Sequence, residues 1–143
     1  MGRDEGYDRP SEAEIEFKRL FERITHKPLL PADDWFCPIL GILFEIKDSQ
    51  KYESGLFTFK GEYRMNKISL ERHVNGDAFG KYRSQVKQCL IVIKFADKWM
   101  FTTPELADAN SRNDVDNTYG DRPTLFVAFN PSIFKPFRFE DYA

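Results

Sequence analysis

The sequence predicts a single α/β domain in which an N-terminal helix and further helices flank a mixed β-sheet. The chain has 143 residues, the size of one ordinary domain. Residues 12–25 carry the apolar spacing of a helix. Residues 89–95 form an apolar run without alternation, which is typical of a strand covered on both faces. Together these observations favour the α/β class.

The N-terminal part is predicted to be a flexible start followed by a capped helix. Residues 1–10 have no apolar period, so we expect the folded domain to span residues 11–143. Ser11 and Glu14 have the spacing of a capping box, which predicts a helix over residues 12–25. Pro28 and Pro31 then lead into a loop.

The next segment is predicted to be a β-hairpin. Residues 35–47 are too apolar for a loop, and they are interrupted by Pro38 and Gly41, where we expect a tight turn between two short strands. Residues 56–60 are predicted to be a short extended piece. Residues 67–75 fit a strand or a helix, and we favour a helix that Gly76 ends.

The remaining elements follow from apolar runs and turn residues. Residues 89–95 are predicted to be a strand, residues 99–103 its hairpin partner, residues 104–109 a short helix and residues 110–121 a polar loop. Residues 124–143 are expected to contain a strand at 125–129 and an aromatic tail. The tail rings are spaced as if laid over a groove and could meet a protein partner: Phe134, Phe137, Phe139 and Tyr142.

Composition excludes several classes of protein. With 41% hydrophobic, 31% charged and 15% aromatic residues, the chain is too apolar to be disordered and too charged for a membrane protein. The first thirty residues are charged, so we expect an intracellular protein, cytoplasmic or in the nucleoid or nucleus, neither secreted nor membrane-bound. Cys37 and Cys89 fit no zinc spacing and are predicted to be core residues.

Charge is distributed unevenly along the chain. Residues 47–98 contain 11 Lys/Arg and 6 Asp/Glu, whereas residues 1–46 contain 6 and 10 and residues 99–143 contain 4 and 7. The net charges of the three parts are therefore -4, +5 and -3 in chain order. A basic middle is compatible with a polyanionic partner such as nucleic acid.

The strongest chemical signal lies in the predicted hairpin. Glu45 and Lys47 share one strand face because alternate residues point the same way. A turn centred on Ile39–Leu40 places residue 34 opposite residue 45, and a turn one residue later places it opposite residue 47. Both put Asp34 on the charged face and Asp33 toward the core, whereas a register shifted by one exchanges the two aspartates.

Two carboxylates that converge at a hairpin suit Mg²⁺, which takes one or two carboxylates together with waters and a substrate phosphate. A neighbouring lysine can orient an attacking water and offset negative charge on the phosphate. This arrangement is suited to metal-assisted phosphodiester hydrolysis. The alternative is that Glu45 and Lys47 are ordinary polar residues on the wet face of an edge hairpin.

The order of these elements resembles the PD-(D/E)xK nuclease superfamily, above all Holliday-junction resolvases and compact restriction-type endonucleases. The resemblance covers residues 11–106: a helix with Glu14, an Asp33-Asp34 pair, Glu45-Ile46-Lys47, a helix, an apolar strand and a tryptophan-bearing hairpin. It implies a restriction-endonuclease-like core and a metal-dependent DNA endonuclease, with the resolution of branched DNA in recombination among the roles it suggests.

The resemblance also implies roles for individual residues. Asp34 and Glu45 would be metal ligands, Glu14 would complete the site from the helix, and Lys47 would serve the attacking water. Glu16 is the alternative to Glu14, and Asp33 the alternative to Asp34. The cofactor would be Mg²⁺, with Mn²⁺ as a substitute, and cutting both DNA strands would require a homodimer.

The basic middle supplies the predicted DNA contacts, because lysine and arginine bind backbone phosphates. We expect these seven residues to contribute: Lys60, Arg64, Lys67, Arg72, Lys81, Arg83 and Lys87. His26 and His73 lack a companion nucleophile or ligand and are predicted to be surface or capping residues. The functional alternative is a non-enzymatic interaction module, a helix on a β-meander that serves as a subunit of an assembly. A helix at residues 67–75 favours the nuclease, and a strand there favours the module or a small barrel.

Overall fold

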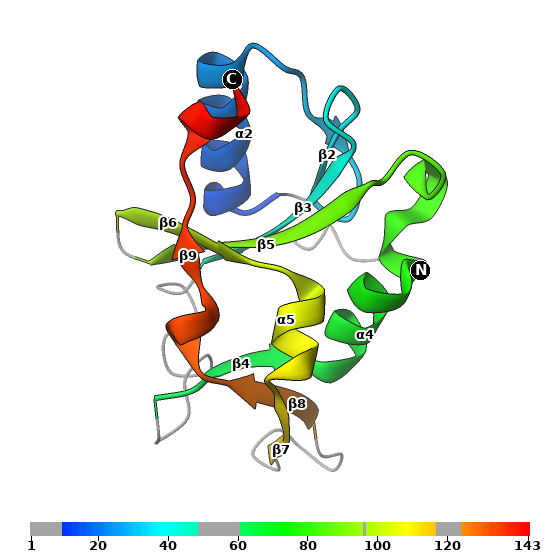
Figure 1. Cartoon of the computed structure of the whole chain (residues 1–143), viewed down its shortest axis with the longest axis vertical. Helices are drawn as coiled ribbons and strands as arrows, with labels where there is room; N and C mark the ends of the chain where they lie inside the picture. The colour runs from blue at the N-terminus through cyan, green and yellow to red at the C-terminus, as the bar shows by residue number, and fades with distance from the viewer. Residues whose placement is uncertain (1–9, 49–60, 96, 117–123) are drawn as a thin grey trace.

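The computed structural model describes residues 10–48, 61–95, 97–116 and 124–143 (Figure 1). Its larger sheet has six strands and is mixed, because β3 and β5 run parallel while the other neighbours are antiparallel. In spatial order the strands are β1 (Leu30–Pro31), β2 (Trp35–Cys37), β3 (Ile42–Asp48), β5 (Gln88–Phe95), β6 (Lys98–Thr102) and β9 (Lys135–Pro136). The molecule is thus mixed α and β, with helices packed on a mixed sheet, as predicted.

A second, antiparallel sheet has three strands in the order β4 (Tyr63–Asn66), β8 (Thr124–Phe129) and β7 (Arg112–Asp116). The predicted strand at 125–129 is confirmed as β8. The predicted polar loop is wrong over residues 112–116, which form edge strand β7. The sequence does not reveal this strand because edge strands often carry charged side chains and therefore lack the alternation of apolar and polar residues that marks a half-buried strand.

Helices cover both faces of the larger sheet (Figure 1). One face carries α2 and the C-terminal turn η3 (Phe139–Tyr142), and the other faces α4 and α5. The second sheet lies beyond α4 and α5. The helical elements are α2 (Glu12–Thr25), α4 (Lys67–Asn75), η1 (Asp77–Tyr82), α5 (Pro104–Ala109), η2 (Pro131–Ile133) and η3.

Helix α2 forms where the sequence predicts it. Ser11 caps its N-terminus: the Ser11 hydroxyl accepts from the Glu14 N–H at 3.2 Å, and Glu14 Oε2 accepts from the Ser11 N–H at 2.7 Å. The reciprocal bonds satisfy amides that would otherwise lack partners at the helix start. The helix ends at His26, which adopts a left-handed conformation with φ of 59°. His26 is exposed, in agreement with its predicted capping role.

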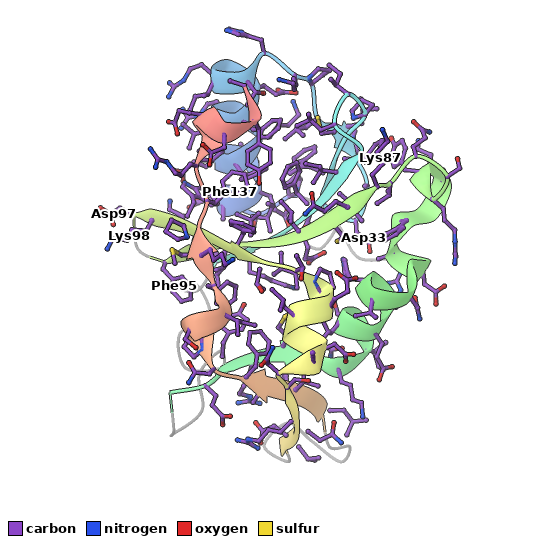
Figure 2. The ribbon with its side chains drawn as sticks, viewed as in Figure 1. Asp33, Lys87, Phe95, Asp97, Lys98 and Phe137 are labelled. Atoms are coloured by element: carbon purple, nitrogen blue, oxygen red, sulfur yellow. The ribbon has the colours of Figure 1, made fainter. Side chains whose placement is uncertain are left out.

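The aromatic tail packs on its own chain. Phe137 and Phe139 are buried in the cluster beneath α2, and Phe134 is buried between the sheets. The Phe17 ring lies at the centre of the first cluster, 5.4 Å from the Phe139 ring and 5.5 Å from the Phe137 ring. Figure 2 shows Phe137 between α2 and the sheet. The groove under the tail is thus the chain's own core, and a partner at this tail stays a prediction.

The hairpin register is one of the two that the sequence allows. Trp35 pairs with Phe44, and Cys37 pairs with Ile42, so the turn is centred on Ile39–Leu40. Trp35 packs with Phe44 and Ile46 in the core beneath α2, as expected. Gly41 ends the turn with φ of 69°, a conformation that favours glycine. Glu45 and Lys47 therefore point to the opposite face of the sheet, toward α4.

Helix α4 confirms the favoured interpretation of residues 67–75. Asn66 caps it, with its side-chain oxygen accepting from the Ser69 N–H at 3.0 Å, and Gly76 ends it with φ of 87°. The predicted strand, hairpin partner and short helix are confirmed as β5, β6 and α5. The predicted extended piece at 56–60 and all but the last residue of the predicted flexible start lie outside the described residues.

Within the described part of the chain, no helix has the length and apolar character needed to cross a membrane.

Candidate functional site

The Asp34 side chain continues the hydrogen-bond ladder between β2 and β3. Strand β2 begins at Trp35, and the Asp34 carboxylate accepts a hydrogen bond from the Ile46 N–H at 2.5 Å. The carboxylate thus takes a ladder position that the β2 backbone does not reach. It is thereby fixed next to the segment Glu45-Ile46-Lys47, whose central residue lies twelve positions further along the chain.

Glu45 is a buried carboxylate in contact with two basic side chains, Lys47 and His73. It is 8% exposed, on a strand whose neighbours are almost entirely buried. Lys47 Nζ lies 3.1 Å from Glu45 Oε1, and His73 Nε2 lies 2.7 Å from Glu45 Oε2. Burial raises the pKa of Glu45, but the charges and contacts of Lys47 and His73 outweigh it and lower that pKa to about 2. Glu45 is therefore ionised at neutral pH.

The prediction that His73 is a surface or capping residue is wrong. His73 is 3% exposed and lies on the buried side of α4, one helical turn after the buried Leu70. The spacing of Leu70 and His73 is the signal that could have shown this, because residues three apart share a helix face. Ile68 and Arg72 lie on the solvent side of the same helix.

Lys47 is the more accessible partner of Glu45. Its side chain keeps 31% of its surface exposed, against 4% for the His73 side chain. The negative charge of Glu45 raises the pKa of Lys47 and outweighs the opposing effect of burial. The nearby Tyr63 and Asp34 act in the same direction. Lys47 therefore carries a firmly held positive charge on a side chain that is partly exposed.

Asp34 is in the opposite electrostatic situation. Burial raises its pKa, and the charge of Glu45 and a side-chain hydrogen bond with Glu14 raise it further; only the Ile46 N–H lowers it. The pKa of Asp34 therefore lies well above its usual value. The site thus contains a carboxyl group whose negative charge is opposed by two other carboxylates.

The structure brings Glu14, Asp34, Glu45 and Lys47 together, and it separates the two alternative residues from them. Glu16 pairs instead with Lys94 Nζ at 2.5 Å. Asp33, which the predicted register directs toward the core, is 38% exposed in its side chain and lies 3.8 Å from Arg72 on α4 (Figure 2). It lies in a bend before β2 and not in the strand, so strand alternation does not apply to it.

The side chains of the site have donor chemistry that suits Mg²⁺. Among the residues that the structure describes, no three His, Cys, Asp or Glu side chains are arranged to enclose a metal ion. Mg²⁺ is held in proteins by as few as one or two carboxylates, with waters and substrate completing its shell. Asp34 and Glu45 supply such a pair, and a divalent cation would relieve the repulsion that raises the pKa of Asp34. The chemistry of the donors therefore fits the ion.

The predicted DNA contacts fall into two groups. Arg64 on β4 is 11% exposed in its side chain, lies 3.3 Å from Asp114 and stacks on Phe126, so its position is structural. Lys60 lies outside the described residues. The other predicted residues lie on α4, on η1 and on the segment that leads into β5: Lys67, Arg72, Lys81, Arg83 and Lys87. Figure 2 shows Lys87 just before the start of β5.

Those in the second group are mostly exposed. Arg72, Lys81, Arg83 and Lys87 are exposed, and Lys67 is half-buried. The ion pairs of Arg72 with Asp33 at 3.8 Å and of Arg83 with Asp77 at 3.6 Å are long and solvated, and such pairs are weak. These cations can thus exchange their protein partners for phosphate.

Comparison with known proteins gives no assignment. No protein-family model, no curated protein and no solved structure matches this chain.

Proposed function

We propose that this protein is a Mg²⁺-dependent DNA endonuclease with its site at Asp34, Glu45 and Lys47. The observation that carries the proposal is the convergence of these three side chains with Glu14 at the end of the β2–β3 hairpin. A solvated surface pair would not require a Glu45 that is 8% exposed and a carboxyl cluster that raises the pKa of Asp34. Such perturbed groups concentrate at functional sites.

Each residue has a role that follows from its position. Asp34 and Glu45 would hold the metal, and Glu14, which shares a side-chain hydrogen bond with Asp34, would support that pair from α2. Glu14 already caps that helix through Ser11, so it serves the site from a fixed place. Mg²⁺, when bound, would offset the charge of the scissile phosphate and lower the pKa of a bound water.

Lys47 would act on the water and the phosphate directly. Its ammonium group remains charged at neutral pH and its side chain is partly exposed, so it would orient the attacking water and stabilise the negative charge that develops on the phosphate. Glu45 holds Lys47 from the same strand face, with Ile46 between them pointing to the other face. The pair thus places the Lys47 cation beside the carboxylates of the site.

The order of elements supports the same proposal. Helix α2, the β2–β3 hairpin, helix α4, strand β5 and its hairpin partner β6 come in the order that the resemblance to PD-(D/E)xK nucleases implies, with the short strand β4 between β3 and α4. The helix at residues 67–75 and the burial of the tail rings weaken the case for the interaction module, whose partner surface those rings were to supply. In this proposal the exposed cations of α4 and η1 bind the DNA backbone, and a homodimer cuts both strands.

The test is cleavage of labelled plasmid, linear duplex and four-way junction DNA with Mg²⁺ or Mn²⁺. We expect the wild type to cut at least one of them, and Asp34→Asn, Glu45→Gln and Lys47→Met to lose at least about a hundredfold in rate, as when one stabilising group is removed from such a site. The preferred substrate would identify the branch of nuclease.

Two matched controls come from the same elements. Glu16→Gln changes a carboxylate on α2 that pairs with Lys94, and Asp33→Asn changes the neighbour of Asp34. Both should cut at close to the wild-type rate. If the folded wild type cuts none of the three DNAs with either metal, or if the control variants lose as much activity as the site variants, the proposal is wrong.

A further inference from the structure

We propose that His73 is a positioning residue that fixes the Glu45 carboxylate for metal binding, an inference that rests on the proposed function. His73 was not predicted to belong to the site. Its ring nitrogens bridge two elements: Nε2 lies 2.7 Å from Glu45 Oε2 on β3, and Nδ1 lies 2.7 Å from the Ser69 carbonyl oxygen on α4. The ring therefore connects the backbone of α4 to the candidate ligand.

The contacts define the state of the ring. A carbonyl oxygen and a carboxylate only accept hydrogen bonds, so each ring nitrogen that faces one must carry a hydrogen. Both nitrogens of His73 face such an oxygen, so the ring can donate to both only when both nitrogens are protonated. The Nε2–H is not aligned for an ideal hydrogen bond to Glu45, so the contact is an ion pair at short distance.

The burial of His73 excludes direct contact with DNA. Its side chain is 4% exposed, whereas the Lys47 side chain is 31% exposed. His73 can therefore affect a phosphate or a water only through Glu45. Groups that bind a metal-ligating side chain from outside fix its orientation, and their loss typically weakens metal binding by about 10- to 100-fold.

Helix α4 supplies the rigidity that positioning needs. Leu70, at 1% exposure, packs with Ile91 and Ile93 of β5 and fixes the helix above the sheet. The Asn66 side chain caps the first turn through the Ser69 N–H. His73 thus projects from a fixed helix toward β3, and its two contacts together with Lys47 restrain both oxygens of Glu45.

The test compares His73→Leu, which fills the space without a donor, with His73→Gln, which keeps an N–H that can reach Glu45. Mn²⁺ binding to each folded protein is followed by the electron paramagnetic resonance signal of free Mn²⁺. We expect His73→Leu to raise the Kd for Mn²⁺ at least about tenfold and His73→Gln to restore most of the affinity. In cleavage assays at saturating Mn²⁺, the KM for DNA should stay unchanged in both variants.

The exposed α4 neighbour offers a matched control. Val74→Ala, at a residue that is 36% exposed, should bind Mn²⁺ as the wild type does. A measurement on the wild type covers the case that His73→Leu does not fold: Mg²⁺ should shift the ¹⁵N resonances of the His73 ring and leave those of the exposed His26 unchanged, with a His26→Gln variant assigning the two.

The possible outcomes separate this inference from the proposed function. If the wild type binds Mn²⁺ and cuts DNA, but His73→Leu does both equally well or Mg²⁺ leaves the His73 resonances unshifted, the positioning role is wrong and the nuclease stands. If His73→Gln is as impaired as His73→Leu, the N–H contact is not what matters, and the inference is also wrong. If the wild type neither binds Mn²⁺ nor cuts DNA, both proposals are wrong.

Discussion

The Ile46 N–H donates a 2.5 Å hydrogen bond to Asp34 Oδ2. This bond joins the residue before β2 to the residue that separates Glu45 from Lys47 in β3. It fixes the Asp34 carboxylate beside strand β3, although Asp34 itself lies outside strand β2. The site therefore depends on a side chain that continues a backbone ladder, and a change in β2–β3 register would remove it.

Asp34→Asn is expected to stabilise the protein while abolishing cleavage. Because the pKa of Asp34 is raised, the folded state holds that proton more tightly than the unfolded chain does, and the protein loses stability as the pH rises above the unfolded-state pKa of this group. Asparagine keeps an oxygen for the Ile46 N–H and removes the charge, so we expect a gain of about 1 kcal/mol in the free energy of unfolding at neutral pH. Urea unfolding measures it, and a less stable Asp34→Asn protein would contradict the charge repulsion at this site.

Mg²⁺ should reverse that order of stability. A ligand that binds the folded state alone raises the melting temperature. We expect millimolar Mg²⁺ to raise the Tm of the wild type and to leave that of Asp34→Asn unchanged, with Asp33→Asn responding as the wild type does. Equal shifts in all three proteins would show that the ion binds elsewhere.

The stability contributed by His73 should decrease as pH rises. Burial lowers the pKa of His73, but its contacts with Glu45 and Ser69 outweigh that effect and raise the pKa above the ordinary value of 6.5. A raised folded-state pKa contributes stability that is complete below the unfolded value and is lost as pH passes the folded value. The stability difference between wild type and His73→Gln should therefore be constant well below pH 6.5 and shrink as the pH rises above that value. Urea unfolding over this pH range measures the difference, and a value that stays constant throughout would contradict the charged form of His73.

DNA affinity should depend on the exposed cations of η1 and the following segment. We expect the double variant Lys81→Gln/Lys87→Gln to bind duplex DNA more weakly and to reduce the slope of log K against log salt by about 0.9 for each phosphate that the variant no longer binds. Arg64→Gln should leave that slope unchanged, because Arg64 is engaged with Asp114 and Phe126. Fluorescence anisotropy at several salt concentrations distinguishes these cases, and an unchanged slope in the double variant would place the DNA elsewhere.

Phe17→Ala should be among the most destabilising substitutions. The fully buried ring packs against Phe44 at 5.0 Å and against the tail ring of Phe139 at 5.4 Å. Loss of a buried phenylalanine typically costs about 3–5 kcal/mol. Ile15→Ala, at a residue of the same helix that is 53% exposed, should change stability by no more than about 0.5 kcal/mol. Thermal unfolding of the two variants gives the comparison.

Much of the fold can be predicted because its signals are local. Ser11 and Glu14 mark the start of α2, and Gly76 marks the end of α4, since each residue type satisfies a particular need of a helix terminus. The hairpin register is also limited to a few choices, because Glu45 and Lys47 make one face of β3 charged. Trp35 and Phe44 were therefore expected to share the apolar face, and the structure pairs them.

The parts that were missed depend on distant contacts. Strand β7 cannot be recognised from its own residues, because Arg112 and Asp114 are typical of loops. In the folded chain these two residues form ion pairs with Glu62 and Arg64, which lie about fifty residues earlier in the sequence. The contact of His73 with Glu45 was missed for the same reason: the spacing from Leu70 could indicate that His73 is buried, but its partner lies twenty-eight residues earlier in the chain. Spacing alone therefore finds the carboxylates of the candidate site and the helix α4, but not the contact between His73 and Glu45.

The packing of the C-terminal segment, β9 on β6 and η3 on α2, also has a consequence for folding during synthesis. Lys27 Nζ donates to the Tyr142 carbonyl oxygen at 2.7 Å, and the Phe137 N–H donates to the Trp99 carbonyl oxygen at 2.8 Å. While a ribosome still encloses residues 137–142, the apolar side of α2 lacks these partners. The nascent chain then exposes Phe17 and Phe44 more than the folded protein does. Chaperone binding and aggregation would compete with folding during this stage of synthesis.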